Sequence, residues 1–314
     1  MRYLCEVFFM NMKTLRANLL LVLTAALWGA AFVAQSTAMD AIGPFTFNGV
    51  RMLIGSLVLL PLLWVMNRLE RKKPEYRPMT RADYKLLVTG GVLCGIALFF
   101  ASTFQNYGII YTTAGKAGFI TTIYVVLVPI LALIFLRVKS HWLTWIYAAI
   151  AMVGFYLLAL GGGFGNINKG DLLVLVCAVL FAVHILIIDR YSPHVNGVAL
   201  SSIQFFVCAV LSLIAALITE DISFADITRA AVPILYAGVC SCGIAYTLQV
   251  IAQKDTDPTV AALLMSLESV FSVLFGWLLL HEQLTASEYA GCGVVFLAVV
   301  LSQIPPEKLR IKKK

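Results

Sequence analysis

The most constraining feature of this chain is a succession of long apolar stretches that are separated only by short polar gaps. A helix needs about 20 mostly apolar residues to cross a hydrocarbon core about 30 Å thick. Because lipid offers no hydrogen-bond partners, such stretches satisfy their backbone groups as helices. Ten of them lie at residues 18–38, 45–66, 86–105, 114–136, 142–160, 171–189, 198–218, 230–252, 259–280 and 286–304. The sequence therefore predicts an all-α integral membrane protein with ten transmembrane helices.

The composition agrees with this fold class and excludes others. Hydrophobic residues make up 61% of the 314 residues and charged residues only 12%, whereas soluble proteins carry about 25% charged residues. Ten spans use roughly 200 residues, which leaves no room for a separate catalytic or nucleic-acid-binding domain. The net charge of +7 lies in the short polar gaps, so we predict the lipid bilayer, and not nucleic acid, as a partner.

The distribution of lysine and arginine predicts the orientation of the chain. If the N-terminus lies in the cytoplasm, 19 of the 23 basic residues fall in cytoplasmic segments. Only Lys116, Lys169 and Arg229 then fall outside, and Arg51 lies within the second stretch. Cytoplasmic loops are enriched in basic residues, so both termini are predicted to be cytoplasmic in a multi-pass protein of the cell membrane.

The beginning of the chain leaves one point open. Lys13 and Arg16 precede the first apolar stretch as they would in a signal peptide. That stretch is long and nine others follow it, so we predict an uncleaved first helix. Translation could begin at Met10 or Met12 instead of Met1.

Prolines lie at the start of two apolar stretches and inside a third. Gly43-Pro44 opens the second stretch and Pro258 opens the ninth, as expected for proline at a helix start. Pro129 lies inside the fourth stretch, where it predicts a kink.

The two halves of the chain are related in sequence. With an offset of 144 residues, Ala-Ser-Thr-Phe-Gln at 101–105 meets Ala-Tyr-Thr-Leu-Gln at 245–249. Nearer the start of each half the offset is 153, which pairs Arg51 with Gln204. The difference between the offsets matches the long basic loop at 67–85, which the second half lacks.

Each half contains five predicted spans, and we predict two repeats over 18–160 and 171–304. An odd number of spans inverts the second repeat relative to the first. Inverted repeats build many secondary transporters, with the substrate site near the midplane at the repeat interface. Chance similarity between apolar segments is the alternative interpretation.

Motifs in both halves make the chain resemble a known family. They are Leu27-Trp28-Gly29 with Phe32, Gly43-Pro44, Arg51, Gln105, Ala261-Ala262, Glu268, the run Gly276–Glu282, and Gly291. On these residues the chain resembles the drug/metabolite transporter superfamily, specifically EamA-type transporters with paired five-helix domains. The resemblance implies transport of small organic solutes such as amino acids or toxic metabolites, often outward. The chain departs from the family pattern where Ser269, and not proline, follows Glu268.

Glu268 is the sharpest candidate for a functional residue. Ionisable groups at the centre of a span cost about 2.5 to 3.5 kcal/mol. Glu268 follows Pro258 by ten residues, which places it about 15 Å along the ninth span and near its middle. We interpret Glu268 as a substrate or proton site, with a hydrogen-bonded structural carboxylate as the alternative.

Arg51 and His184 also lie within predicted spans. Arg51 is about 9 Å into its span and could snorkel to the outer interface; a structural or gating role is as compatible with this position as substrate contact. His184 could relay protons, or it could be a core histidine whose ring is satisfied by neighbours.

Polar uncharged and aromatic residues complete the proposed substrate-binding or gating set. They are Gln105, Gln204, Gln249, Trp28, Tyr124 and Tyr246. Gln105 and Gln249 correspond in the repeat and are therefore expected to face a central cavity, although glutamine also joins helices in membranes. Trp28 could line the same cavity or simply pack between helices.

The sequence carries no motif for catalysis, a cofactor or ATP hydrolysis. His281-Glu282 resembles the start of a zinc-protease motif, but Thr285 stands where the second histidine would be, and no P-loop pattern occurs. We therefore predict no enzyme activity, no metal and no cofactor.

The function predicted from these features is secondary transport by alternating access, with export as the expected direction. A channel-like facilitator is the alternative, and an intramembrane enzyme is a weaker one. A small-molecule substrate is the expected partner. The identity of the substrate, the coupling ion and the oligomeric state stay open at this point.

Overall fold

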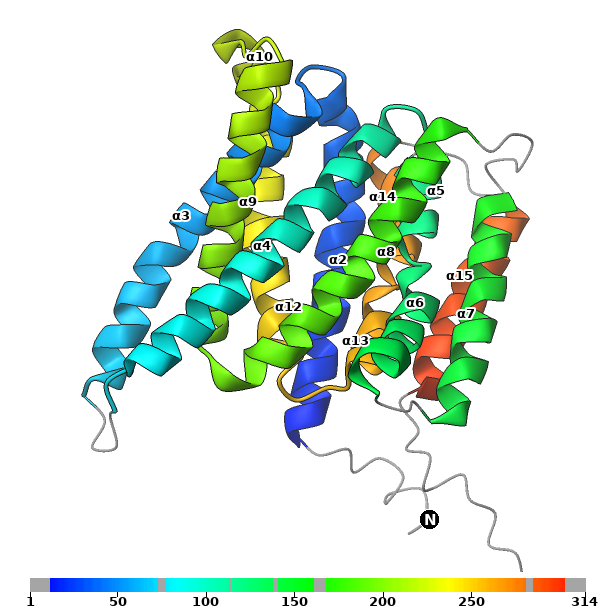
Figure 1. Cartoon of the computed structure of the whole chain (residues 1–314). Helices are drawn as coiled ribbons and strands as arrows, with labels where there is room; N and C mark the ends of the chain where they lie inside the picture. The colour runs from blue at the N-terminus through cyan, green and yellow to red at the C-terminus, as the bar shows by residue number, and fades with distance from the viewer. Residues whose placement is uncertain are drawn as a thin grey trace, which may run out of the picture.

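The computed structural model describes residues 12–72, 77–112, 114–137, 141–160, 168–280 and 285–302, and every regular element in these ranges is helical (Figure 1). Eight of the described helices are long and apolar enough to cross a membrane, by length and composition. Two shorter apolar helices, Trp142–Leu157 and Tyr289–Ser302, lie where the fifth and tenth spans are predicted. The all-helical prediction is confirmed for the described residues, and the count of ten spans stays a prediction. The alternative start at Met10 lies outside these ranges.

The first half consists of three long helices, a broken helix and a further helix. These elements are α2 (Met12–Met39), α3 (Pro44–Glu70), α4 (Arg81–Ile109), α5 (Ala114–Thr121), α6 (Tyr124–Leu131), the π-helix η1 (Ala132–Leu136) and α7 (Trp142–Leu160). Pro44 occupies the first turn of α3 behind an extended Gly43, while Thr80 and Asp83 form a reciprocal capping box at the start of α4. The N–H groups of a first helical turn have no partner within the helix. A proline there has no N–H to satisfy, and a capping box supplies acceptors for these groups.

The second half repeats this order with more interruptions. Its elements are α8 (Lys169–Tyr191), the 3-10 helix η2 (Ser192–His194), α9 (Gly197–Thr219), α10 (Phe224–Arg229), α11 (Ala231–Leu235), the π-helix η3 (Tyr236–Tyr246), α12 (Thr247–Ala252), α13 (Pro258–Met265), α14 (Glu268–Leu280) and α15 (Ala286–Ser302). Asn168 and Asp171 form the capping box of α8, and the Asp257 carboxylate caps α13 ahead of Pro258. The short helix α10 was not predicted from the sequence.

The fourth and ninth predicted spans are broken at equivalent positions. α5 and α13 each have eight residues and start 144 residues apart, and α6 and α14 also start 144 apart. At the breaks the Thr122 hydroxyl donates to the Phe119 carbonyl, and the Ser266 hydroxyl donates to the Leu263 carbonyl, both at 2.7 Å. Such side-chain bonds compete with the helical backbone pattern and bend helices.

The interruption in the fourth span lies upstream of its proline. Pro129 lies inside α6, downstream of the interruption at Thr122 and Ile123. The ninth span breaks in the same way without an internal proline. The interruption is therefore separate from Pro129, and the kink at Pro129 stays a prediction; the π-helix η1 begins three residues after this proline.

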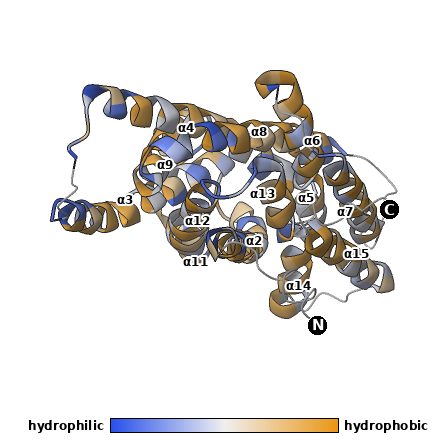
Figure 2. Cartoon of the chain, turned by 90° about the horizontal axis from the view of Figure 1, so that it is seen from below, coloured by the Kyte–Doolittle hydropathy of each residue, from blue (hydrophilic) through white to orange (hydrophobic). Residues whose placement is uncertain are grey.

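Small residues let the helices approach one another closely around α2 and α4. A Cβ on Gly29 of α2 would lie 2.4 Å from the Phe271 Cβ, and a Cβ on Gly95 of α4 would lie 2.7 Å from the Val207 Cβ. Close backbone approach through small residues is the usual way in which membrane helices associate. α2 thereby lies at the centre of the bundle (Figure 1). Hydrophobic residues predominate along the helices (Figure 2), and many large apolar side chains are exposed.

Candidate functional site: a central polar cavity

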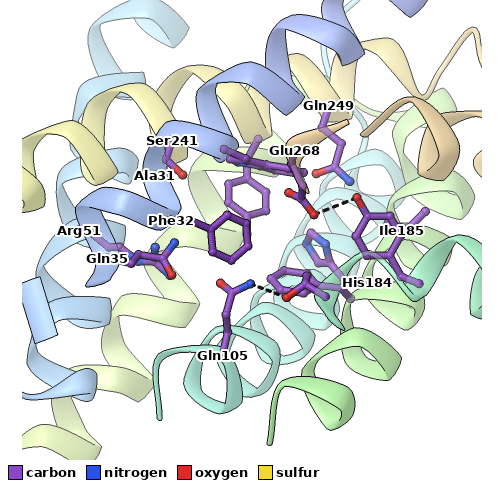
Figure 3. Close-up of a pocket in the computed structure, with 15 residues that line it drawn as sticks. Ala31, Phe32, Gln35, Arg51, Gln105, His184, Ile185, Ser241, Gln249 and Glu268 are labelled. Atoms are coloured by element: carbon purple, nitrogen blue, oxygen red, sulfur yellow. Dashed lines mark hydrogen bonds between the residues drawn. The ribbon is translucent and has the colours of Figure 1, made fainter. Parts of the chain in front are cut away.

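A cavity beside α2 gathers polar side chains from both halves of the chain. It is lined by Trp28, Ala31, Phe32, Gln35, Arg51, Gln105, Thr121, Tyr124, Phe181, His184, Ile185, Ser241, Tyr246, Gln249 and Glu268 (Figure 3). The cavity volume is about 30 Å³, which has room for water but not for an organic solute. The helices must therefore separate before a solute can occupy this cavity.

The Glu268 carboxylate lies at the helix break of the second half. It is the first residue of α14 and is only 4% exposed. The Tyr124 hydroxyl, at the start of α6 in the first half, donates to Glu268 Oε1 at 3.1 Å. No basic side chain among the described residues lies within 4 Å of this carboxylate. The positive end of the α14 dipole would stabilise a negative charge on this carboxylate.

Arg51 is buried on α3 and is 2% exposed. Its Nε and Nη2 atoms donate to Asn48 Oδ1 at 3.1 and 3.0 Å, and its guanidinium lies 4.9 Å from the centre of the Phe47 ring. Asn48 is fixed in turn by donating to Ser212 Oγ at 2.8 Å. Within the described part of the chain no carboxylate pairs with Arg51. The snorkelling interpretation was wrong, because the neighbouring polar groups hold the guanidinium inside the bundle.

Aromatic rings form one wall of the cavity. The Trp28 and Tyr246 rings have centroids 4.6 Å apart, and the His184 ring meets Tyr246 edge-on at 6.0 Å. His184 Nε2 forms a 2.9 Å hydrogen bond with Gln204 Oε1. Flat rings of this kind present an apolar surface with a few polar atoms, which is typical of sites for small organic ligands.

Four buried polar atoms of the lining residues have no hydrogen-bond partner among the described residues. They are Trp28 Nε1, Gln35 Oε1, His184 Nδ1 and Gln249 Oε1. Buried polar groups are nearly always hydrogen-bonded in proteins, so a cluster of unpaired ones requires an explanation. A bound polar ligand would supply both the donors and the acceptors that these atoms lack.

The structure brings together eight of the nine residues predicted as the site. Gln204 alone does not line the cavity; it lies behind His184 and orients that ring. Sequence reasoning missed Gln35 and Ser241. Gln35 follows Trp28 by seven residues, and this spacing places both on one face of a helix. Gln105, which was predicted, donates to the Thr121 hydroxyl at 3.3 Å.

A metal site receives no support from the described residues, in which no group of three or more histidine, cysteine, aspartate or glutamate side chains is placed to hold an ion. The zinc-like motif at His281 and Glu282 lies outside the described residues.

Comparison with known proteins places this architecture in a family of transporters. The model of the EamA-like transporter family matches residues 15–160 and again residues 168–303. The chain is 35% identical over 293 residues to a protein named "Uncharacterized transporter" from Archaeoglobus fulgidus, which covers 93% of this chain and 87% of that protein. It is 25% identical to the inner membrane transporter YedA from Escherichia coli, over 88% of this chain and 86% of YedA.

A solved structure supports the fold. It superimposes with a TM-score of 0.74 at 18% identity and covers 94% of this chain and 98% of that one. The two family matches follow the division into halves, and the apolar helices agree with a protein that crosses the membrane several times. This chain therefore belongs to the EamA-like transporter family and is a multi-pass membrane transporter of the drug/metabolite transporter type.

Proposed function

We propose that the protein is a secondary transporter of small zwitterionic organic solutes, of which amino acids are the simplest. One observation carries the proposal: Arg51 and Glu268 line the same cavity, and neither has a counterion among the described residues. Figure 3 shows them on opposite sides of the cavity, with Gln35 beside Arg51 and Gln249 near Glu268.

The cost of burying two unpaired charges favours a solute that carries both a positive and a negative group. A charge inside a membrane protein is expensive and usually finds a partner. Two unit charges 4 Å apart attract by about 4 kcal/mol at an effective dielectric constant of about 20. A solute with one carboxylate and one ammonium group would satisfy both residues at once, which a simple amine or a simple acid would not.

The neutral residues of the cavity fit the same class of solute. Gln249 Oε1, near Glu268, can accept a hydrogen bond from an ammonium group, while the Gln35 amide beside Arg51 and the Trp28 N–H can donate to a carboxylate. The Trp28 and Tyr246 rings offer an apolar face to a solute side chain. These groups support recognition of a polar head with an organic substituent.

We infer a mechanism of exchange around Glu268. The carboxylate can hold a proton or the cationic group of a solute, but not both, and this competition would couple outward movement of solute to inward movement of protons. The two halves would be inverted repeats that rearrange around the cavity. Basic residues on one side of the membrane support cytoplasmic termini.

Uptake into proteoliposomes tests this proposal. A panel would contain amino acids, their decarboxylated amines and their N-acetylated acids, each with and without a proton gradient. We expect saturable transport and counterflow of the zwitterions only. Glu268→Gln and Arg51→Gln should each abolish it, whereas Asp221→Asn, an exposed carboxylate far along the chain from the cavity residues, should not.

The outcomes separate the parts of the proposal. Equal transport of amines and zwitterions would overturn the role of Arg51. Rates that rise linearly with the gradient and show no counterflow would indicate a channel-like facilitator instead of a carrier.

A further inference from the structure

A second cavity lies at the end of the bundle where α3 ends and α4 and α9 begin. Its volume is about 870 Å³, far larger than the central cavity and within the range of sites for organic ligands. The last turns of α3, the first turns of α4, the segment before α9 and the end of α12 line it. Seen from this end, α3 and α4 lie apart from each other, with α9 and α12 between them (Figure 2).

The lining of this cavity is divided into a basic rim and an apolar interior. Arg71, Arg77 and Lys254 supply the basic groups. Leu63, Leu87, Val198 and Ile251 supply the apolar surface. An amphiphilic ligand with an anionic head matches this arrangement, because its head and its hydrocarbon part meet different surfaces.

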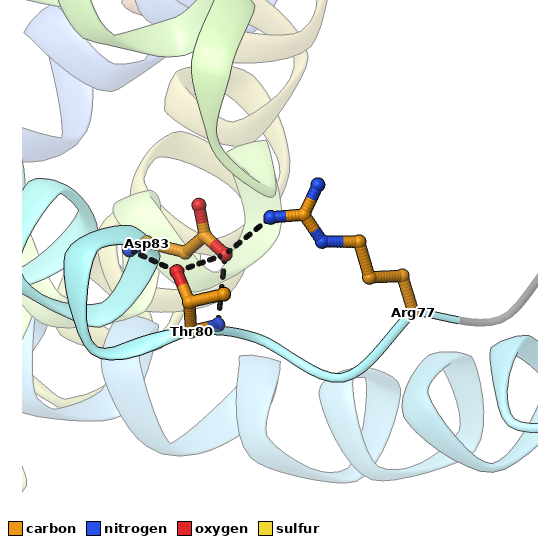
Figure 4. A network of polar contacts seen from close by, with 3 residues as sticks. All are labelled: Arg77, Thr80 and Asp83. Carbon is orange, nitrogen blue, oxygen red and sulfur yellow. Dashed lines mark hydrogen bonds and ion pairs between the residues drawn. The ribbon is translucent and has the colours of Figure 1, made fainter.

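The basic groups at the rim keep free hydrogen-bonding capacity. Arg77 contacts Asp83 at 3.9 Å with 76% of its side chain exposed, and such surface pairs are weak. Asp83 is already engaged by the backbone N–H and the hydroxyl of Thr80 at 2.8 and 2.7 Å (Figure 4). Lys254 donates to the Val195 carbonyl at 2.6 Å, which leaves two of its three ammonium hydrogens free.

Lys254 is an exposed residue whose ammonium group is held at the Val195 carbonyl. Burial lowers the pKa of its ammonium group, while the neighbouring Asp255 acts in the opposite direction. A phosphate beside Lys254 would stabilise the charged form through charge-assisted hydrogen bonds. The carboxylates of Glu70 and Asp83 also line the cavity, so three cations face two carboxylates and the lining keeps a net positive charge.

The cavity lies beside a surface that is suited to lipid. Leu62, Trp64 and Leu69 on α3 are 46%, 62% and 57% exposed. The Arg68 guanidinium stacks 5.3 Å from the centre of the Trp64 ring. Tryptophan with a nearby basic residue is typical of the level of the lipid head groups. The cavity therefore opens at the depth where a phospholipid phosphate lies.

We propose that this cavity binds an anionic phospholipid of the cytoplasmic leaflet, with the phosphate at Arg71, Arg77 and Lys254 and the upper acyl chains against Leu63 and Leu87. The assignment to the cytoplasmic leaflet rests on the proposed orientation of the chain. Binding itself does not rest on the transport proposal, because its measurement needs no substrate. Basic residues next to a span attract anionic lipid electrostatically.

Native mass spectrometry of the purified full chain tests the site. The protein would be released from micelles that contain phosphatidylglycerol or phosphatidylcholine. We expect wild type to retain phosphatidylglycerol, and the variant Arg71→Gln/Arg77→Gln/Lys254→Gln to bind it at least tenfold more weakly. The matched control Lys72→Gln/Arg81→Gln/Lys85→Gln removes the same charge from exposed residues that do not line the cavity, and it should retain the lipid.

A second variant keeps the charges and fills the space. Ala199 lines the cavity, and Ala199→Phe should also weaken retention of phosphatidylglycerol. Equal losses in the two charge variants would overturn the proposal in favour of a diffuse surface attraction. Displacement of the lipid by millimolar inorganic phosphate, or equal retention of phosphatidylcholine, would overturn it as well.

Discussion

The two ends of the helical bundle are held by equivalent contacts with different acceptors, a carboxylate at one end and an amide at the other. Where α4 passes into α5, the Thr112 hydroxyl donates to Asp171 Oδ1 at 2.8 Å. At the opposite end (Figure 1), where α12 passes into α13, the Thr256 hydroxyl meets Asn18 Oδ1 at 3.5 Å. The offsets of 144 and 153 residues that relate the halves also relate these two contacts.

The helices also pack more closely beside the Asp171 contact than beside the Asn18 contact. A Cβ on Gly108 would lie 2.4 Å from Val174 Cγ2, so α4 and α8 touch at backbone distance. The same Cβ would lie 3.0 Å from the carbonyl oxygen of Gly170. The residues that correspond to Gly108 and Gly170 at the other end are Ala252 and Ala17, which are buried but larger than glycine. A carboxylate acceptor also makes a shorter and stronger hydrogen bond than an amide. The end at Asp171 is therefore closed more firmly than the end at Asn18.

The centre of the cavity shows a similar contrast between the halves. Tyr124 and Glu268 occupy equivalent positions at the start of α6 and α14 and are bonded to each other. One half thus provides a neutral donor and the other an ionisable acceptor. A repeated scaffold fixes the positions, and single side chains make the two halves unequal.

The largest effect is expected at this central pair. Glu268→Gln should reduce the initial rate of transport in proteoliposomes at least about 100-fold, because an ionisable group is lost from the cavity. Tyr124→Phe should reduce this rate about fivefold, because it removes one hydrogen bond worth about 1 kcal/mol. Uptake rates at equal amounts of reconstituted protein measure the difference. Equal losses would mean that the two positions do not carry different chemistry.

The second largest effect is expected at Gly108, near the Asp171 contact. Gly108→Ala should lower the free energy of unfolding by about 1–3 kcal/mol, because the new methyl group has no space against Val174. The matched change at the other end, Ala252→Gly, should cost about 1 kcal/mol through lost burial and added chain freedom. Thermal unfolding in detergent ranks the two, and an unchanged midpoint for Gly108→Ala would refute the close contact.

Exchanging the acceptors should shift the balance between the ends. Asp171→Asn should loosen its end and Asn18→Asp should tighten the other, each by about 1 kcal/mol, or about fivefold in the population open on that side. A cysteine at Ala31, in a background without other cysteines, reports access from either side to an impermeant maleimide. Both variants are expected to favour the conformation that is open at the Asp171 end. A shift of the two variants in opposite directions would contradict the comparison.

The smallest effect is expected from the long neutral contact. Thr256→Val should change the free energy of unfolding by less than about 0.5 kcal/mol, because a 3.5 Å contact is at the limit of a hydrogen bond. Thr112→Val should cost about 0.6 to 1.7 kcal/mol, the range for hydrogen bonds in membrane proteins. Valine keeps the shape of threonine, so the pair isolates the hydroxyl. A larger loss for Thr256→Val would reverse the order of the two ends.

Local and periodic features were predictable from the amino-acid sequence. Apolar stretches of about 20 residues predict helices because lipid leaves the backbone no other partner. The residue types at Pro44, Pro258 and Asn168 mark helix starts, since these starts depend on neighbours within four residues. The offset of 144 residues anticipated the pairing of Gln105 with Gln249 in one cavity, which the structure contains.

Only the tertiary structure decided how side chains from distant segments meet. The position of Arg51 in its span would have allowed its side chain to reach the interface. Instead it donates to Asn48, which is held by Ser212 of the other half, and stays inside the bundle. Gln204 looked equivalent to Arg51, yet it turns to His184 and leaves the cavity lining. A hydrogen bond or an ion pair depends on atoms brought together by packing, whereas helix formation depends on each stretch by itself. For that reason the sequence determined the helices and their repetition, and the fold decided which polar groups share the cavity.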